Sequence, residues 1–166
     1  MKQRSEFKAP WSAGLWGISL IASLVVLGMP IFIANSEIKS YVSPFFVPLL
    51  ILIWLLTVLY TVRGYRLEKG RLFIRRLFWD TPVSLDGFQS AQLIGGDVVK
   101  GSIRLFGNGG LFAFCGWFWN RSMGRYRMWV TDTKRLVLIQ CAGRKMVVSP
   151  DDPQEFVKAV ERIRDA

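Results

Sequence analysis

The feature that most constrains this chain is an uncharged stretch from Val42 to Val62 that ends abruptly at an arginine. The stretch is rich in leucine, isoleucine, valine and phenylalanine. At about 1.5 Å per residue, a helix of this length crosses a hydrocarbon core of about 30 Å. Arg63 begins a segment with several more basic residues, in which short apolar runs are separated by a turn at Lys69 and Gly70. The sequence therefore predicts a membrane span joined directly to a β-rich domain.

A second uncharged stretch, from Ser12 to Ala34, comes earlier in the chain. It exceeds the ~7–15 apolar residues of a cleaved signal peptide, and Trp11 and Trp16 near its start are typical of interfacial anchors. Pro30 is expected to kink this helix or to end it early. We therefore expect an uncleaved two-helix transmembrane hairpin with spans at about 12–34 and 42–62.

The distribution of charge predicts how this hairpin is oriented. The 166 residues include 22 lysines and arginines and 12 acidic residues, a net charge of +10, and most of the excess follows Arg63. The N-terminal segment is also basic, whereas the connector between the spans has only Lys39. The positive-inside rule then predicts a multi-pass protein of the inner (plasma) membrane with both termini in the cytoplasm. A basic domain joined to a span fits an anionic membrane face, so membrane lipids are the expected partners and nucleic acid is not.

The region after Arg63 reads as six or seven short strands separated by turns. The sequence Gly-Asn-Gly-Gly at 107–110 is a strong hairpin-turn signal, because glycine and asparagine supply positive φ. Strand pairs at this spacing favour an antiparallel barrel or sandwich.

The C-terminal segment has a different pattern. Asp152–Glu155 is a helix-capping sequence, and an apolar helical face follows at Phe156, Val160 and Ile163. The predicted fold class is therefore α+β. A two-helix transmembrane hairpin with its N-terminal tail (1–63) precedes a PH-like antiparallel β-roll or barrel capped by a C-terminal α-helix (64–166).

Three stretches carry a resemblance to a known family: GYRLEKGRLFIRR from Gly64, RLFGNGGLFAFCGWFWNRSMGRYRMWVTD from Arg104, and VVSPDDPQEFVKAV from Val147. From Arg63 to about Arg164 the chain resembles the bacterial PH-domain (pleckstrin-homology-like) membrane proteins with two N-terminal transmembrane helices. The resemblance implies a PH-like roll on the cytoplasmic membrane face and implies no reaction.

A basic cluster in the first expected hairpin suggests a lipid site. Eukaryotic PH domains bind phosphoinositide head groups through basic residues in a similar place, so the resemblance implies lipid binding by Arg66, Lys69, Arg71 and Arg75. Strand alternation turns Arg76 to the other face, so it is not included. An equally supported alternative is that these charges only fix the topology and keep the domain soluble.

An aromatic run between residues 111 and 119 is the other candidate surface. It is too short to span a membrane as a helix, and the two faces of a strand cannot both point into a core. Contact with the membrane or a membrane helix is favoured over internal packing, and a partner protein is the third alternative. The residues concerned are Phe112, Phe114, Trp117, Phe118 and Trp119.

Catalytic chemistry has little support. The chain contains no histidine, the commonest general base and metal ligand. Asp151 and Asp152 are better explained by a helix cap, and Arg104 by a solvated loop charge. We expect no catalytic residues, cofactor or metal site, and therefore a binding or scaffolding module. The alternatives are an anionic-lipid sensor and an accessory subunit of a membrane enzyme or transporter, with a membrane-protein partner or a second copy of the chain.

Overall fold

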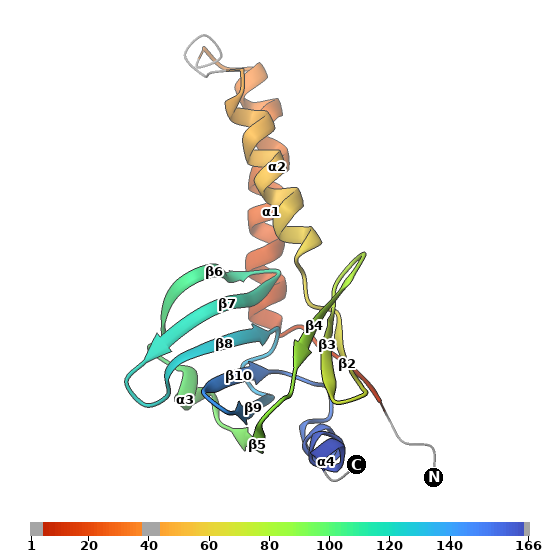
Figure 1. The fold of residues 1–166 in the computed structure, drawn as a ribbon. Helices are drawn as coiled ribbons and strands as arrows, with labels where there is room; N and C mark the ends of the chain where they lie inside the picture. Colours follow the sequence, from red (N-terminus) through yellow and green to blue (C-terminus); the bar gives the residue numbers. More distant parts are fainter. Residues whose placement is uncertain (1–4, 38–43, 165–166) are drawn as a thin grey trace.

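The computed structural model describes residues 5–37 and 44–164, the last two by their backbone alone. Two long helices stand side by side on one end of a domain built from two β-sheets (Figure 1). The first, α1, spans Ala13–Ala34, and the second, α2, spans Phe46–Leu59. Within the described residues, α1 is the one helix long and apolar enough to cross a membrane.

Local contacts explain where α1 begins and where α2 ends. Ser12 caps α1, since its side-chain oxygen accepts a hydrogen bond from the amide of Leu15 at 3.2 Å. Pro30 lies inside α1, so the expectation that it ends the helix early is wrong. Helix α2 has 14 residues and is shorter than the predicted stretch of 42–62, whose first two residues lie outside the described ranges. It ends at Leu59 because the following residues already join the domain, where the amide of Arg63 donates to Arg75 at 2.8 Å.

The first sheet has the strand order β1-β2-β3-β4, with every neighbouring pair antiparallel. Its first strand was not expected, because we predicted an N-terminal tail in that region. Phe7 in this strand is buried, so the N-terminal segment contributes to the core of the domain. The strands are β1 (Glu6–Lys8), β2 (Gly64–Glu68), β3 (Arg71–Arg75) and β4 (Asp80–Ser84).

The second sheet has the order β5-β9-β10-β8-β7-β6, and a short helix, α3 (Gly96–Val99), connects β5 to β6. Strands β8 and β10 are parallel, so the expectation of a wholly antiparallel arrangement is wrong at this pair. The described residues form ten strands, more than the six or seven expected. The six strands here are β5 (Phe88–Ile94), β6 (Ile103–Leu111), β7 (Ala113–Asn120), β8 (Gly124–Val130), β9 (Leu136–Cys141) and β10 (Arg144–Val148).

The predicted hairpin turn at 107–110 is also wrong, because these residues lie inside β6. Gly107 and Gly116 face each other across β6 and β7. A Cβ on Gly107 would lie 2.2 Å from the carbonyl oxygen of Cys115, so both glycines are required by close approach of the two strands. The reversal between the strands occurs at Phe112, whose φ of 64° is unusual for a bulky residue.

The main core lies between the sheets and is closed by the C-terminal helix α4 (Pro153–Arg164). The ring of Phe156 is fully buried and meets that of Phe7 edge-on at a centroid distance of 5.0 Å. Val160 is buried as predicted, whereas the side chain of Ile163 lies outside the described atoms. Helix α4 lies at the end of the domain opposite α1 and α2 (Figure 1). The α+β class, with PH-like sheets and a closing C-terminal helix, is confirmed.

Candidate membrane-proximal site

Phe112 joins the domain to its helices. Its side chain is 8% exposed, and its ring centroid lies 6.0 Å from that of Trp11 and 6.1 Å from that of Trp54. The backbone amide of Phe112 donates to the hydroxyl of Ser19 in α1 at 3.0 Å. The indole of Trp54 in α2 donates to the hydroxyl of Ser23 in α1, also at 3.0 Å. The turn between β6 and β7 is therefore packed against the N-terminal segment and both helices.

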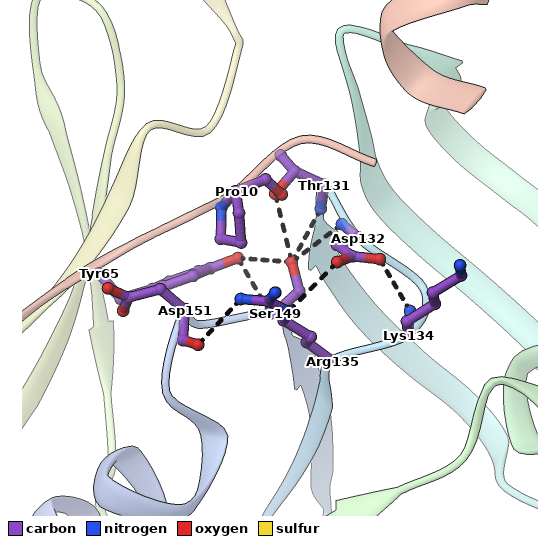
Figure 2. Close-up of polar contacts among 8 residues, drawn as sticks. All are labelled: Pro10, Tyr65, Thr131, Asp132, Lys134, Arg135, Ser149 and Asp151. Carbon is purple, nitrogen blue, oxygen red and sulfur yellow. Dashed lines mark hydrogen bonds and ion pairs between the residues drawn. The ribbon is translucent and has the colours of Figure 1, made fainter. Parts of the chain in front are cut away.

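A buried polar cluster centred on Ser149 fixes the N-terminal segment just before α1 (Figure 2). The Ser149 hydroxyl accepts from the amide of Thr131 at 2.9 Å, and the Ser149 amide donates to the phenol oxygen of Tyr65 at 3.0 Å. The Thr131 hydroxyl donates to the carbonyl of Pro10 at 2.8 Å, and its carbonyl accepts from the amide of Ser12 at 3.0 Å. Burial raises the pKa of Tyr65 far above its ordinary value, so the phenol remains neutral. The cluster sets the direction in which α1 leaves the domain.

The end of α2 is held by Arg76, which is buried. Its guanidinium donates to the backbone carbonyl of Tyr60, the residue that caps α2, and to the hydroxyl of Thr81 at 2.9 Å. It also lies 3.5 Å from Sγ of Cys115 in β7. Arg76 therefore connects α2 to both sheets.

A hollow of about 600 Å³ opens beside Arg76, between the last turns of α2 and strands β6, β7 and β8. Three arginines line it: Arg76, Arg104 and Arg127. The guanidinium of Arg127 lies 4.6 Å from the ring centroid of Trp129 and 5.5 Å from that of Trp117. Such cation–π contacts hold the charge in place while leaving its N–H groups open to an anion.

The profile of the bacterial PH domain family matches residues 63–163, which is more than half of the chain. The chain belongs to the bacterial PH domain family. Comparisons with curated proteins and with solved structures gave no match. The matched region runs from the end of the uncharged stretch to α4 and includes every strand that lines the hollow, whereas α1, α2 and β1 lie outside it.

In this bacterial PH domain, two of the four predicted lipid-binding residues have acidic partners. Arg66 forms an ion pair with Asp80 at 2.9 Å. Arg75 forms one with Glu6 in β1 at 3.1 Å. Their positive charges are therefore partly neutralised within the first sheet.

The other two, Lys69 and Arg71, are exposed at the turn between β2 and β3. Gly64 pairs with Arg75 at the end of the hairpin next to α2, so the turn lies at the far end. At about 3.3 Å per residue, four residues of strand put the turn about 13 Å farther from α2. The structure thus spreads the four residues along the hairpin and does not gather them beside the helices.

The predicted aromatic surface is divided among three environments. Phe112 is buried at the helix base, as described above. Phe118 is buried and Phe114 is half-buried in a second apolar cluster on the outer face of the six-stranded sheet. Trp117 lies in the arginine-lined hollow, and Trp119 is exposed. Contact of this run with lipid or a partner protein stays a prediction.

The three arginines of the hollow are not among the predicted site residues. Strand alternation excludes Arg76 from the predicted cluster, and the sequence around Arg104 favours a solvated loop charge. The alternation of Arg125 and Arg127 in β8 was a weak signal of a basic sheet face. Within the described residues, no group of three or more cysteine, aspartate or glutamate side chains is arranged to hold a metal ion. The hollow is therefore suited to the recognition of an anion by guanidinium groups.

Proposed function

We propose that the protein is a membrane-anchored binding or scaffolding module, in which α1 and α2 form a transmembrane hairpin and the PH-like domain lies on the cytoplasmic face. The observation that carries this proposal is the packing of Phe112 with Trp11 and Trp54, together with its hydrogen bond to Ser19. These contacts attach both helices to the domain. A membrane that holds the helices therefore also holds the domain at its surface.

The lengths of the helices support a domain that reaches into the membrane interface. Leu15 and Ser19 are buried, so α1 is free of the domain from about Leu20 onward. From Leu20 to Ala34 the helix rises about 22 Å, and α2 rises about 21 Å. Both lengths are about 8 Å short of a hydrocarbon core of about 30 Å. Apolar surface on the domain would reduce this mismatch if it entered the interface.

Such apolar surface is exposed on both sides of the helix base. Phe78, in the β3–β4 connection, is 77% exposed, and the neighbouring Trp79 ring meets that of Tyr60 at 5.4 Å. Phe106 in β6 is also 77% exposed and lines the hollow together with Ile53 of α2. Figure 1 shows the β3–β4 connection and β6 at the helix end of the domain. Aromatic side chains are favourable at the level of the lipid head groups.

A second candidate role is that of an accessory subunit, and β6 favours it. This strand forms one edge of the six-stranded sheet, and its exposed side chains include Ile103 and Leu105. An exposed apolar edge can accept a strand from a membrane-protein partner or from a second copy of the chain. The mass of the assembly in mild detergent tests this role, because a mass of one chain plus detergent would contradict it.

The anchor and its orientation are tested by labelling with a membrane-impermeant maleimide in intact cells. In a background with Cys115→Ser and Cys141→Ser, Ser36→Cys in the connector should be labelled from outside. The matched control Gln154→Cys, on the exposed face of α4, should be labelled only after the membrane is permeabilised. The chain should also stay in the membrane after extraction with alkaline carbonate. Labelling of Gln154→Cys in intact cells would reverse the orientation, and release by carbonate would contradict the transmembrane anchor.

A further inference from the structure

The hollow beside Arg76 concentrates positive charge without an acidic counterpart. Within the described part of the chain, no carboxylate forms an ion pair with Arg76, Arg104 or Arg127. A larger hollow of about 780 Å³ beside β1 differs, because its lining includes the ion pair of Arg75 with Glu6. Arg104 and Arg127 are therefore available to a ligand, and Arg76, whose guanidinium already donates to Tyr60 and Thr81, adds positive charge beside them.

Arg76 and Arg127 are also close to each other, in partly desolvated positions. Burial lowers the pKa of Arg127, the Cys115 thiol offsets part of this effect, and the nearby guanidinium of Arg76 lowers the pKa further. Repulsion between Arg76 and Arg127 would be relieved by an anion placed between them. The geometry therefore favours a ligand with concentrated negative charge.

The backbone of β6 and β7 makes room for such a ligand. Gly107 and Gly116 place no side chain on this part of the hollow wall, and a Cβ on Gly116 would lie 2.1 Å from the carbonyl oxygen of Phe106. Gly109 allows Arg104 to fold across the strand, because a Cβ at Gly109 would lie 2.8 Å from Nη1 of Arg104. The glycines thus keep the hollow open and its third arginine in place.

The wall facing the helices is apolar. Ile53 and Leu56 of α2 line the hollow, and both are about half exposed. Helix α2, which carries both residues, runs away from the domain (Figure 1). A single molecule that satisfied both parts of the hollow would need an anionic head and an apolar tail.

We propose that this hollow binds the phosphate of an anionic phospholipid, with the acyl chains lying along Ile53 and Leu56. Guanidinium groups recognise phosphate oxygens through paired, charge-assisted hydrogen bonds. The proposal rests on the proposed function, because only a membrane-embedded α2 would present lipid tails at this position. It differs from the predicted lipid cluster of the first hairpin, since the β2–β3 turn of that hairpin points away from the helices.

The test is a lipid titration of the full-length chain in mild detergent, with bound lipid counted by native mass spectrometry. The probes are phosphatidylglycerol and, as the neutral-charge comparison, phosphatidylcholine. The test variant is Arg104→Gln/Arg127→Gln, and the matched control is Lys69→Gln/Arg71→Gln, which removes the same charge from the β2–β3 turn. Each lost charge-assisted hydrogen bond should weaken phosphatidylglycerol binding about tenfold or more. The control variant should bind within about twofold of the unmodified chain.

The possible outcomes separate the alternatives. Equal binding of phosphatidylcholine, or an unchanged affinity in the test variant, would overturn the proposal. A larger loss in the control variant would assign lipid binding to the first hairpin. Displacement of phosphatidylglycerol by inorganic phosphate at millimolar concentration would identify a site for soluble anions and also overturn it. If the double variant does not fold, the single variant Arg104→Gln provides the same binding test, because Arg104 is exposed and its replacement should not disturb folding.

Membrane extraction keeps this proposal distinct from the proposed function. If both double variants resist extraction with alkaline carbonate and bind phosphatidylglycerol equally, the proposed lipid site is refuted. The proposed transmembrane anchor is then unaffected. If the unmodified chain is released by carbonate, the anchor fails, and the lipid site fails with it.

Discussion

Replacing Phe112 with alanine tests whether one ring holds the helices to the domain. The side chain is 8% exposed and packs against Trp11 and Trp54. Truncating a buried phenylalanine costs about 3–5 kcal/mol, because it removes apolar contacts and leaves a cavity. We expect the lower part of that range, since the site lies at the edge of the domain, where neighbouring side chains can close in.

The backbone conformation of Phe112 predicts a difference between its alanine and glycine variants. Its φ of 64° lies in the left-handed region, which costs a residue with a Cβ about 1–2 kcal/mol relative to glycine. Phe112→Gly removes one more carbon atom than Phe112→Ala and also removes this strain. The glycine variant should therefore be more stable than the alanine variant by about 1 kcal/mol, which reverses the order expected from size alone.

Thermal unfolding of the full-length chain in one detergent gives the measurement. For a protein of this size, 1 kcal/mol corresponds to about 2–4 °C in Tm. Phe112→Ala should lower Tm by roughly 6–12 °C, taking a cost of about 3 kcal/mol, and Phe112→Gly should recover about 2–4 °C. Phe78→Ala is the matched control, because that ring is 77% exposed and its loss should change stability by less than about 0.5 kcal/mol. An unchanged Tm in Phe112→Ala would refute the packing argument, and equal Tm values for alanine and glycine would refute the strain argument.

The parts of the fold that could be predicted are those with strong local signals. Helix α1 follows from a long uncharged stretch with Ser12 as its cap, and α4 follows from the capping sequence and the apolar face that includes Phe156. Each of these patterns lies within one element, so it can be recognised from the sequence without knowledge of tertiary contacts.

Strand β1 could not be predicted, because its stability comes from a distant segment. It has three residues, and its pairing with β2 places Phe7 opposite Tyr65. Nothing in a short basic segment indicates a strand, and the burial of Phe7 becomes evident only when Phe156 of α4 is beside it. The same reason made α2 shorter than its uncharged stretch, since Tyr60 is drawn toward the domain by Arg76.

The glycines at 107–110 give a misleading turn signal, because two local geometries require the same residue. A tight turn and a close approach of two strands both exclude a Cβ. The distinguishing information is the position of Gly116 opposite Gly107, which depends on the register of β6 and β7. A local pattern cannot supply that register, and the true reversal falls on a phenylalanine, which carries no turn signal.

The candidate site was the least predictable part, because its residues come from separate elements. Arg76 follows a strand of the first sheet, whereas Arg104 and Arg127 belong to the second sheet. The hollow also needs α2, which lies outside the matched family region. Spacing along the chain indicates basic residues but not which of them lack an acidic partner. The paired Arg66 and the unpaired Arg127 look alike in sequence.

Two further predictions concern the core. Phe156→Ala should lower the free energy of unfolding by about 3–5 kcal/mol, because the ring is fully buried against Phe7. Denaturant titration measures this loss, and an unchanged midpoint would mean that α4 does not close the core. The second concerns Tyr65, whose pKa burial raises in the folded state above the value of about 10 that it has when unfolded. The folded state therefore holds the proton more tightly, so this contribution to stability is complete below a pH of about 10 and is lost as the pH rises above it. Tyr65→Phe should be less stable at neutral pH, because the amide of Ser149 loses its acceptor, yet its stability should fall less steeply between about pH 10 and 12. Tyr126, whose pKa burial also raises, should leave a residual slope in the variant; an equal slope in both proteins would show that the Tyr65 phenol ionises without opening the core.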